Sequence, residues 1–331
     1  MINRACERRV PGFSLRSLAA IALALLSPAA LAQSPSSSDP WRFHDPAFAR
    51  IAQPGAQPVF IAGEFNGCEG AVWIQDAAGG HLRFGAVHTD VAFRWDPKNG
   101  LRGLRAPSYE ASAFVPHPRG GVIAAEQTTR RIVRYEQNGE VTTLAERFEG
   151  KRLNRPNDLA LRADGSVWFT DPDYLFKVRP HETKELPGQF VFRLNPETGG
   201  LRAMVRDLIL PNGIAFGPDE SALYVGDSGT KLVYRWPLRV DDTLGPREEF
   251  VRVKNGPPDG IAFDREGNLW VACNRSVEIF SPAGKPLAEL MLPGKRPASV
   301  AFGGPDGDWL FVCTRAAVYR LTLAVPLARR T

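Results

Sequence analysis

The chain has 331 residues, of which 44% are hydrophobic and 23% are charged. This composition excludes a disordered or fibrous protein and favours a globular chain with a large core. The formal net charge is +5, but no basic run is interleaved with aromatic residues, so nucleic acid is not an expected partner. Length alone suggests about two domains, whereas 31 Gly and 28 Pro indicate many turns.

The first 32 residues resemble an export signal. Four arginines among the first sixteen residues precede an apolar run from Leu18 to Leu26, and Ala30-Leu31-Ala32 follows. A basic start, a short apolar run and an A-x-A end predict a secretory signal peptide over 1–32, cleaved near Ala32. The run is shorter than the roughly 20 apolar residues of a spanning helix, so stable membrane insertion is not expected. We therefore predict a periplasmic or secreted protein.

Two alternatives remain open at this end of the chain. An uncleaved membrane anchor is one of them. The pair Arg8-Arg9 raises the question of a twin-arginine signal, but Val10-Pro11 after it is a poor match, which favours the general export route.

Cleavage after Ala32 would change the charge and the cysteine count. It removes four Arg and one Glu, which leaves 37 basic against 35 acidic residues and a net charge of +2. Cys68, Cys273 and Cys313 remain, an odd number that leaves at least one free thiol or an intermolecular bridge. The sequence leaves open whether Cys273 pairs with Cys313. Residues 33–57 are rich in Ser, Pro, Ala and Gln and are interpreted as a linker with one helical turn near Asp45–Ala52.

A repeat then determines the expected fold. A short pattern recurs, in which a small or apolar pair and a Gly or Asp turn are followed by an apolar, β-rich run. Its six copies begin at Glu69, Ser112, Asn157, Asn212, Asp259 and Ala298. A period of roughly 40–50 residues with several short strands per unit is typical of a β-propeller. We predict an all-β, six-bladed propeller over 58–331.

The last repeat is short, and the segment Val59-Phe60-Ile61-Ala62 before the first repeat has the composition of a strand. We predict that this N-terminal strand completes the sixth blade. Such a closure joins both ends of the chain and leaves no open sheet edge.

Four of the six repeat starts carry oxygen donors. They are Glu69, Asn157, Asn212 and Asp259. Because equivalent positions of successive blades converge on a central channel, these side chains are expected to meet there. Carboxylate and amide oxygens suit hard cations, and two carboxylates balance a divalent ion. The alternative is that Asn-Gly and Asp-Gly serve only as turn formers.

Several motifs carry a family resemblance from about Phe65 to Arg320. They are Gly150-Lys-Arg-Leu-Asn-Arg-Pro-Asn-Asp-Leu, Asp164-Gly-Ser-Val-Trp-Phe-Thr-Asp-Pro-Asp-Tyr, Leu210-Pro-Asn-Gly-Ile-Ala-Phe-Gly-Pro-Asp-Glu and Pro258-Asp-Gly-Ile-Ala-Phe-Asp. Together they resemble the regucalcin, senescence marker protein and gluconolactonase family of six-bladed propellers, and its exported bacterial gluconolactonase-like members in particular.

The resemblance implies a role for each matching residue. Glu69, Asn212 and Asp259 match the family's metal ligands, and Asp259 matches the aspartate that also serves as the base. Asn157 matches an asparagine beside metal and substrate, and Arg155 falls where some members place a substrate-binding arginine. The implied cofactor is one divalent cation, with Ca²⁺ as first choice and Zn²⁺, Mg²⁺ or Mn²⁺ as alternatives.

The chain departs from the family pattern at three places where we expect substrate loops. It has Glu69-Gly-Ala71, Glu126-Gln127-Thr128 and Asp171-Pro-Asp-Tyr174-Leu175 where related bacterial lactonases often read Glu-Gly-Pro, Glu-His-Gly and Asp-Pro-x-Tyr-Gly. These departures put the identity of the substrate in doubt, and leave the metal set intact.

The expected function is therefore a metal-dependent hydrolase that opens a small sugar lactone. The cation would polarise the carbonyl, and Asp259 would accept a proton from the attacking water. Two alternatives stay open. One is a propeller without enzymatic activity that binds a ligand or protein around a structural metal, since fold alone assigns no chemistry; the other is a related esterase or phosphoesterase. The sequence leaves the oligomeric state unknown.

Overall fold

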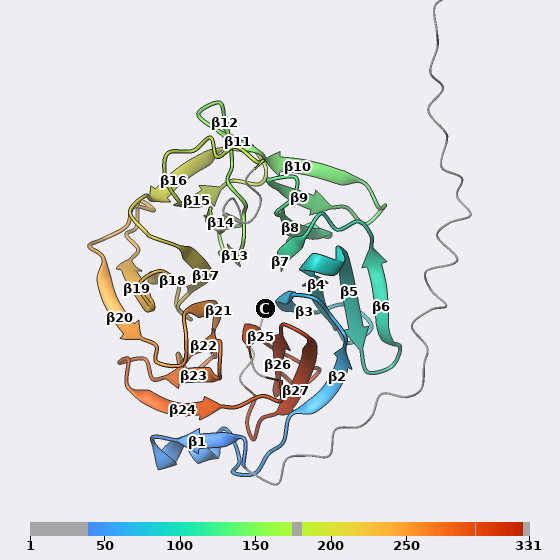
Figure 1. Cartoon of the computed structure of the whole chain (residues 1–331), viewed down its shortest axis with the longest axis vertical. Helices are drawn as coiled ribbons and strands as arrows, with labels where there is room; N and C mark the ends of the chain where they lie inside the picture. The colour runs from blue at the N-terminus through green and yellow to red at the C-terminus, as the bar shows by residue number, and fades with distance from the viewer. Residues whose placement is uncertain (1–38, 174–180, 295, 327–331) are drawn as a thin grey trace, which may run out of the picture. The chain divides into compact units, whose positions relative to one another are not determined.

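In the computed structural model, residues 39–173, 181–294 and 296–326 are described, and within them the chain is almost entirely β-structure. Six antiparallel sheets stand around a common centre (Figure 1). The predicted all-β, six-bladed propeller is thus confirmed. The described ranges contain no α-helix, and two short 3-10 helices, η3 (Pro46–Arg50) and η4 (Val87–Thr89), are the exceptions to strand and loop.

Each blade is a meander whose innermost strand comes first, except that the last blade takes its outermost strand from the N-terminal side. Blade 1 consists of β3 (Cys68–Ile74), β4 (His81–Ala86), β5 (Val91–Asp96) and β6 (Gly100–Arg105). Blade 2 consists of β7 (Ala111–Pro116), β8 (Val122–Glu126), β9 (Arg131–Tyr135) and β10 (Val141–Ala145). Blade 3 consists of β13 (Leu159–Leu161), β14 (Val167–Asp171), β15 (Phe190–Leu194) and β16 (Leu201–Val205). Blade 4 consists of β17 (Pro211–Phe216), β18 (Ala222–Asp227), β19 (Leu232–Pro237) and β20 (Glu248–Arg252). Blade 5 consists of β21 (Pro258–Phe263), β22 (Leu269–Cys273), β23 (Val277–Phe280) and β24 (Pro286–Leu290). Blade 6 consists of β25 (Pro297–Gly303), β26 (Trp309–Thr314), β27 (Ala317–Thr322) and β2 (Val59–Gly63). A two-stranded hairpin, β11 (Arg147–Phe148) and β12 (Lys151–Arg152), stands between blades 2 and 3.

The core is divided among the junctions between blades. Each of the six hydrophobic clusters joins one pair of neighbouring blades. At the junction of blades 3 and 4, for example, fully buried Trp168 meets Phe216 edge to face, with ring centroids 5.4 Å apart. Both faces of each sheet are therefore apolar, which is why the repeats are rich in Val, Leu, Phe and Trp.

The N-terminal strand closes the ring. β2 pairs antiparallel with β27, with Val59 opposite Arg320 and Phe60 opposite Tyr319. This is the predicted closure, and it stabilises the ring because opening blade 6 requires both ends of the chain to separate.

The segment interpreted as a linker has a structural role over its described part. β1 (Trp41–Phe43) adds a fifth strand to blade 5 beside β24, with Trp41 opposite Leu290. The predicted helical turn corresponds to η3, whose Phe48 packs on Trp270 at 5.8 Å between ring centroids. Residues 39–57 therefore differ from a linker because their aromatic side chains cover the core between blades 5 and 6.

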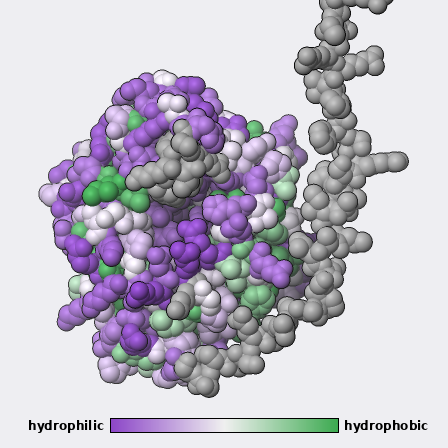
Figure 2. All heavy atoms as spheres, in the orientation of Figure 1, coloured by the Kyte–Doolittle hydropathy of each residue, from purple (hydrophilic) through white to green (hydrophobic). Residues whose placement is uncertain are grey.

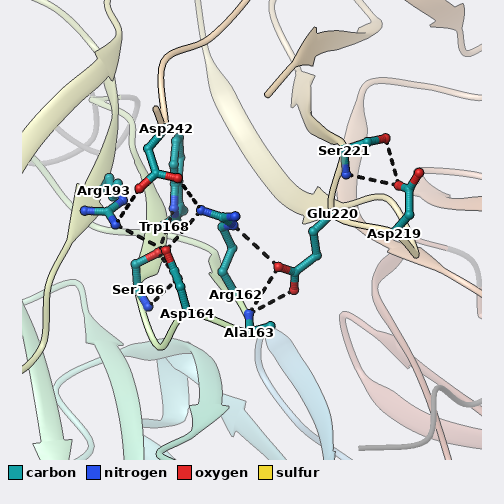
Figure 3. Close-up of polar contacts among 10 residues, drawn as sticks. All are labelled: Arg162, Ala163, Asp164, Ser166, Trp168, Arg193, Asp219, Glu220, Ser221 and Asp242. Carbon is teal, nitrogen blue, oxygen red and sulfur yellow. Dashed lines mark hydrogen bonds and ion pairs between the residues drawn. The ribbon is translucent and has the colours of Figure 1, made fainter. Parts of the chain in front are cut away.

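Charged side chains also join blades 3 and 4 away from the channel (Figure 3). Asp242 accepts from Arg162 at 2.8 Å and from Arg193 at 3.0 Å. Asp164 pairs with the same two arginines at 3.0 and 3.2 Å. We call these four residues the blade 3–4 network.

The predicted signal peptide over 1–32 lies outside the described residues. Among those described, no helix has the length and apolar character needed to cross a membrane.

Cys68, Cys273 and Cys313 are all buried free thiols. Cys273 belongs to the cluster between blades 4 and 5, whereas Cys313 lies beside Cys68 between blades 6 and 1. Cys273 and Cys313 are thus not paired, because they serve different blade junctions.

Candidate functional site at the channel mouth

The six repeat starts lie at the entry of the innermost strands. In blades 1, 4 and 5 the inner strand is irregular at the donor residue: the pairing register shifts just after Glu69, between Pro211 and Ile214, and between Pro258 and Ile261. Such a bulge re-aims side chains at the end of a strand. Asn212 and Asp259 thus lie within a bulge, Glu69 lies directly before one, and all three line the channel cavity described below.

The glycine after each of these donors is a contact point between blades. A Cβ on Gly213 would lie 2.2 Å from the carbonyl oxygen of Asp259, and one on Gly260 would lie 2.8 Å from that of Ala298. Neither glycine has a positive φ. The Asn-Gly and Asp-Gly pairs are thus strand residues at which neighbouring backbones approach closely, and the turn-former alternative is wrong for these two.

Hydrogen bonds between successive blades fix the donor backbones. The Ser112 hydroxyl donates to the carbonyl of Asn157 at 2.7 Å, and Thr170 donates to that of Asn212 at 2.8 Å. Ser228 donates to the carbonyl of Pro258, next to Asp259, at 2.7 Å. The backbones at Asn157, Asn212 and Asp259 are therefore held in part by a hydroxyl of a neighbouring blade.

The structure brings the four predicted ligands together around one small cavity. Its lining includes Glu69, Asn157, Asn212 and Asp259, together with Ser112, Asp158, Ala298, Ser299 and two glycines, and its volume is about 10 Å³. A space of this size holds about one water molecule and is therefore sized for a single ion.

Burial and mutual repulsion disfavour the charged forms of the Glu69 and Asp259 carboxylates. Loss of hydration raises the pKa of Glu69, and the nearby Asp259 carboxylate raises it further. Burial likewise raises the pKa of Asp259, while Arg315 and a hydrogen bond from Asn212 act in the opposite direction. A bound cation would relieve this like-charge repulsion.

Sequence reasoning missed two charged residues here. Asp158 lines the cavity and accepts from the backbone N–H groups of Ile214 at 3.0 Å and Leu159 at 2.9 Å; burial raises its pKa to about 7. Arg315 follows β26 and lowers the pKa of both Glu69 and Asp259. Asp158 could have been found because it follows the predicted ligand Asn157 in the sequence. Arg315 lies outside the repeat starts, and no sequence pattern marks it as a site residue.

The donor set fits a hard cation by its chemistry. In the described part of the chain, no three His, Cys, Asp or Glu side chains form a metal-binding group. The candidate set instead combines the two carboxylates Glu69 and Asp259 with the two amides Asn157 and Asn212, and an oxygen set of this kind suits Ca²⁺ or Mg²⁺ better than Zn²⁺.

Arg155 does not line this cavity. It is buried, and its guanidinium pairs with Glu110 at 2.6 Å and with Glu182 at 2.9 Å. The preceding Asn154 is fixed by Asp171, whose carboxylate accepts its backbone N–H at 2.7 Å. The structure thus holds Arg155 rigidly beside the site, and its role in substrate binding stays a prediction.

The similarity to known proteins extends from the first blade of the ring to the last. A family model described as the SMP-30/Gluconolactonase/LRE-like region matches residues 68–316. The chain belongs to this family. The match begins in the first blade and ends in the last, so it covers all the strand entries that form the site.

Among its relatives is the gluconolactonase of Zymomonas mobilis, 29% identical over 79% of this chain and 80% of the relative. Another is a 6-deoxy-6-sulfogluconolactonase of Pseudomonas putida, 33% identical over 66% of this chain and 74% of the relative. A solved gluconolactonase of Xanthomonas campestris superposes with a TM-score of 0.80 at 28% identity, covering 87% of this chain and 96% of that one. These similarities support a lactone-hydrolysing enzyme.

Proposed function

We propose that the protein is a metal-dependent sugar lactonase whose site is the channel mouth. The observation that carries the proposal is the convergence of Glu69, Asn157, Asn212 and Asp259 on a cavity of about 10 Å³. Family membership supports the reaction class, and the donor chemistry supports the divalent cation. Ca²⁺ is the proposed ion, with Mg²⁺, Mn²⁺ and Zn²⁺ as alternatives.

When bound by these four residues, the cation would supply Lewis-acid polarisation of the lactone carbonyl. Asp259 is the proposed general base. Its carboxylate takes a proton from the attacking water while the water oxygen bonds to the carbonyl carbon. The ring C–O bond then breaks, and the proton passes to the leaving ring oxygen, which yields the open hydroxy acid.

The neighbouring residues prepare Asp259 for this role. Asn212 donates a hydrogen bond to the Asp259 carboxylate and thereby orients it. Arg315 lowers the pKa of Asp259 against the effect of burial, which keeps more of the carboxylate ionised and able to accept a proton. Asn157 and Arg155 are the proposed contacts to substrate. The guanidinium of Arg155 is held by Glu110 at 2.6 Å.

The substrate itself differs among the relatives, since one is named for gluconolactone and another for a sulfonated gluconolactone. The proposal therefore specifies a sugar lactone and leaves its substituents to experiment. Export to the periplasm or the medium, with cleavage near Ala32, is proposed from the sequence of 1–32 alone.

The decisive experiment is hydrolysis of glucono-1,5-lactone and a panel of other lactones, followed by acid release. The purified protein is assayed after chelation and again after addition of Ca²⁺, Mg²⁺, Mn²⁺ or Zn²⁺. We expect turnover that chelation removes and one or more cations restore. Cation binding without hydrolysis of any lactone would favour the two alternatives, a binding propeller with a structural metal or an esterase or phosphoesterase, and a panel of esters and phosphoesters separates those two.

A further inference from the structure

Three arginines gather on consecutive loops over blades 5 and 6. Arg275 lies in the loop between β22 and β23, Arg296 precedes β25, and Arg315 lies in the loop between β26 and β27. All three side chains are exposed. We call them the rim arginines.

Backbone hydrogen bonds tie these loops into one arc. The N–H of Arg296 donates to the carbonyl of Asn274 at 2.8 Å, and the N–H of Arg315 donates to the carbonyl of Arg296 at 3.1 Å. The carbonyl of Arg315 in turn accepts from Gly67 at 2.9 Å and from Cys68 at 3.3 Å. The arc therefore runs from blade 5 across blade 6 to the residue before Glu69.

Each rim arginine is linked to the cavity lining by sequence, by sheet register or by its electrostatic effect. Arg296 stands two residues before Ala298, which lines that cavity. Arg275 follows Cys273 by two residues, and Cys273 pairs with Pro258, the residue before Asp259. Arg315 is within electrostatic reach of both Glu69 and Asp259.

The guanidinium groups of the rim arginines form no ion pair within the described residues. Across residues 39–173, 181–294 and 296–326, no carboxylate lies at ion-pair distance from any of the three guanidinium groups. Arginines on the other side of the channel differ: Arg155 is paired with Glu110 and Arg131 with Glu126. Around the centre of the ring face shown in Figure 2, hydrophilic residues predominate.

We propose that the rim arginines form an anion-binding arc beside the catalytic cavity, and that the lactone opened there carries an anionic substituent. The substituent is a carboxylate, sulfonate or phosphate, because these planar or tetrahedral oxyanions accept the paired N–H groups of guanidinium. The arc also attracts such substrates to the channel mouth. This inference rests on the proposed lactonase function and assigns its substrate class.

The test compares matched pairs of lactones that differ in charge. One pair is D-glucaro-1,4-lactone, which carries a carboxylate, and neutral glucono-1,4-lactone. The other is 6-phosphoglucono-1,5-lactone and neutral glucono-1,5-lactone. We expect kcat/KM of the anionic member to exceed that of the neutral one by about tenfold in one pair or both, the size of effect that a few exposed ion pairs provide. Higher salt should lower the ratio of the anionic to the neutral kcat/KM toward one, because salt screens the attraction between charges.

In the variant carrying Arg275→Gln, Arg296→Gln and Arg315→Gln, the ratio of the anionic to the neutral kcat/KM should fall by about tenfold. Arg202→Gln is the matched control, since Arg202 is an exposed arginine on β16, the outer strand of blade 3, and it should leave the ratio unchanged. Equal kcat/KM within both pairs, or a preference that the triple variant retains, would overturn the proposal.

A binding measurement separates this inference from the lactonase proposal. If no lactone is hydrolysed, the proposed function fails, and calorimetry with the dianion glucarate in the presence of Ca²⁺ decides on the anion site. Binding that the triple variant weakens by about tenfold supports the arc. No glucarate binding, or equal binding by both proteins, overturns it.

Discussion

The channel mouth and the blade 3–4 network use charged residues in opposite ways. In the network, Asp164 and Asp242 each contact two arginines at 2.8–3.2 Å (Figure 3). At the channel mouth, Glu69, Asp158 and Asp259 gather around one cavity, and burial raises the pKa of all three. In the network the charges join two blades, whereas at the channel mouth they surround the cavity of the proposed cation site.

This difference has a general consequence for stability. Buried carboxylates without an ion-pair partner destabilise the folded chain. Proteins keep such destabilising groups where function requires them. Substitutions of the channel-mouth carboxylates should therefore remove activity without loss of stability of the metal-free protein, whereas substitutions of the network carboxylates should lower stability without loss of activity.

The largest expected effect is that of Asp259→Asn on turnover. The amide cannot accept the proton of the attacking water, so kcat should fall by about a thousandfold, within the usual range for loss of a general base. In chelator the melting temperature should stay the same or rise, because the like charge beside Glu69 is removed. Initial rates and calorimetry measure both quantities, and near-normal turnover would exclude Asp259 as the base.

The second effect concerns the cation. Ca²⁺ at a hundredfold excess over its Kd should stabilise the wild-type protein by about 2.7 kcal/mol. In Glu69→Gln this gain should shrink markedly, while stability in chelator should rise, since the repulsion from Asp259 is gone. Glu248→Gln, at an exposed residue paired with Arg235 at 3.0 Å, is the control. An undiminished Ca²⁺ effect in Glu69→Gln would argue against this ligand.

The close approach of blades 4 and 5 gives a third effect. In Gly213→Ala the new methyl group meets the backbone of Asp259 at 2.2 Å, so we expect a loss of about 1–3 kcal/mol of stability together with reduced activity. Gly103→Ala places its methyl group 3.9 Å from Val91 and serves as control. Chemical denaturation measures both variants, and equal stability would show that the strand entry can relax.

The smallest effect is expected in the network. Asp242→Asn removes the ion pairs to Arg162 and Arg193 while Asn tolerates the positive φ of 61° at this position. We expect a loss of about 1 kcal/mol, because the network is partly buried and shared by several charges. Lactone hydrolysis should not change. A fall in activity at unchanged stability would contradict the division between the two regions.

Much of the fold was predictable because propeller blades repeat. The six strand entries, the all-β class and the closure by Val59–Gly63 follow from local patterns that recur along the chain. The segment 39–57 was not predictable, because its role depends on Trp41 and Phe48 meeting Trp270, a residue more than two hundred positions away.

The candidate site divides in the same way. By itself the sequence determined the four oxygen donors, since each begins a repeat and equivalent repeat positions converge in a ring. Three features emerged from the folded chain alone: Arg315 lowers the pKa of Glu69 and Asp259, Gly213 and Gly260 are contact points between blades, and Arg155 is paired with Glu110. These facts depend on which loops meet across blades, and local sequence carries no record of such distant contacts.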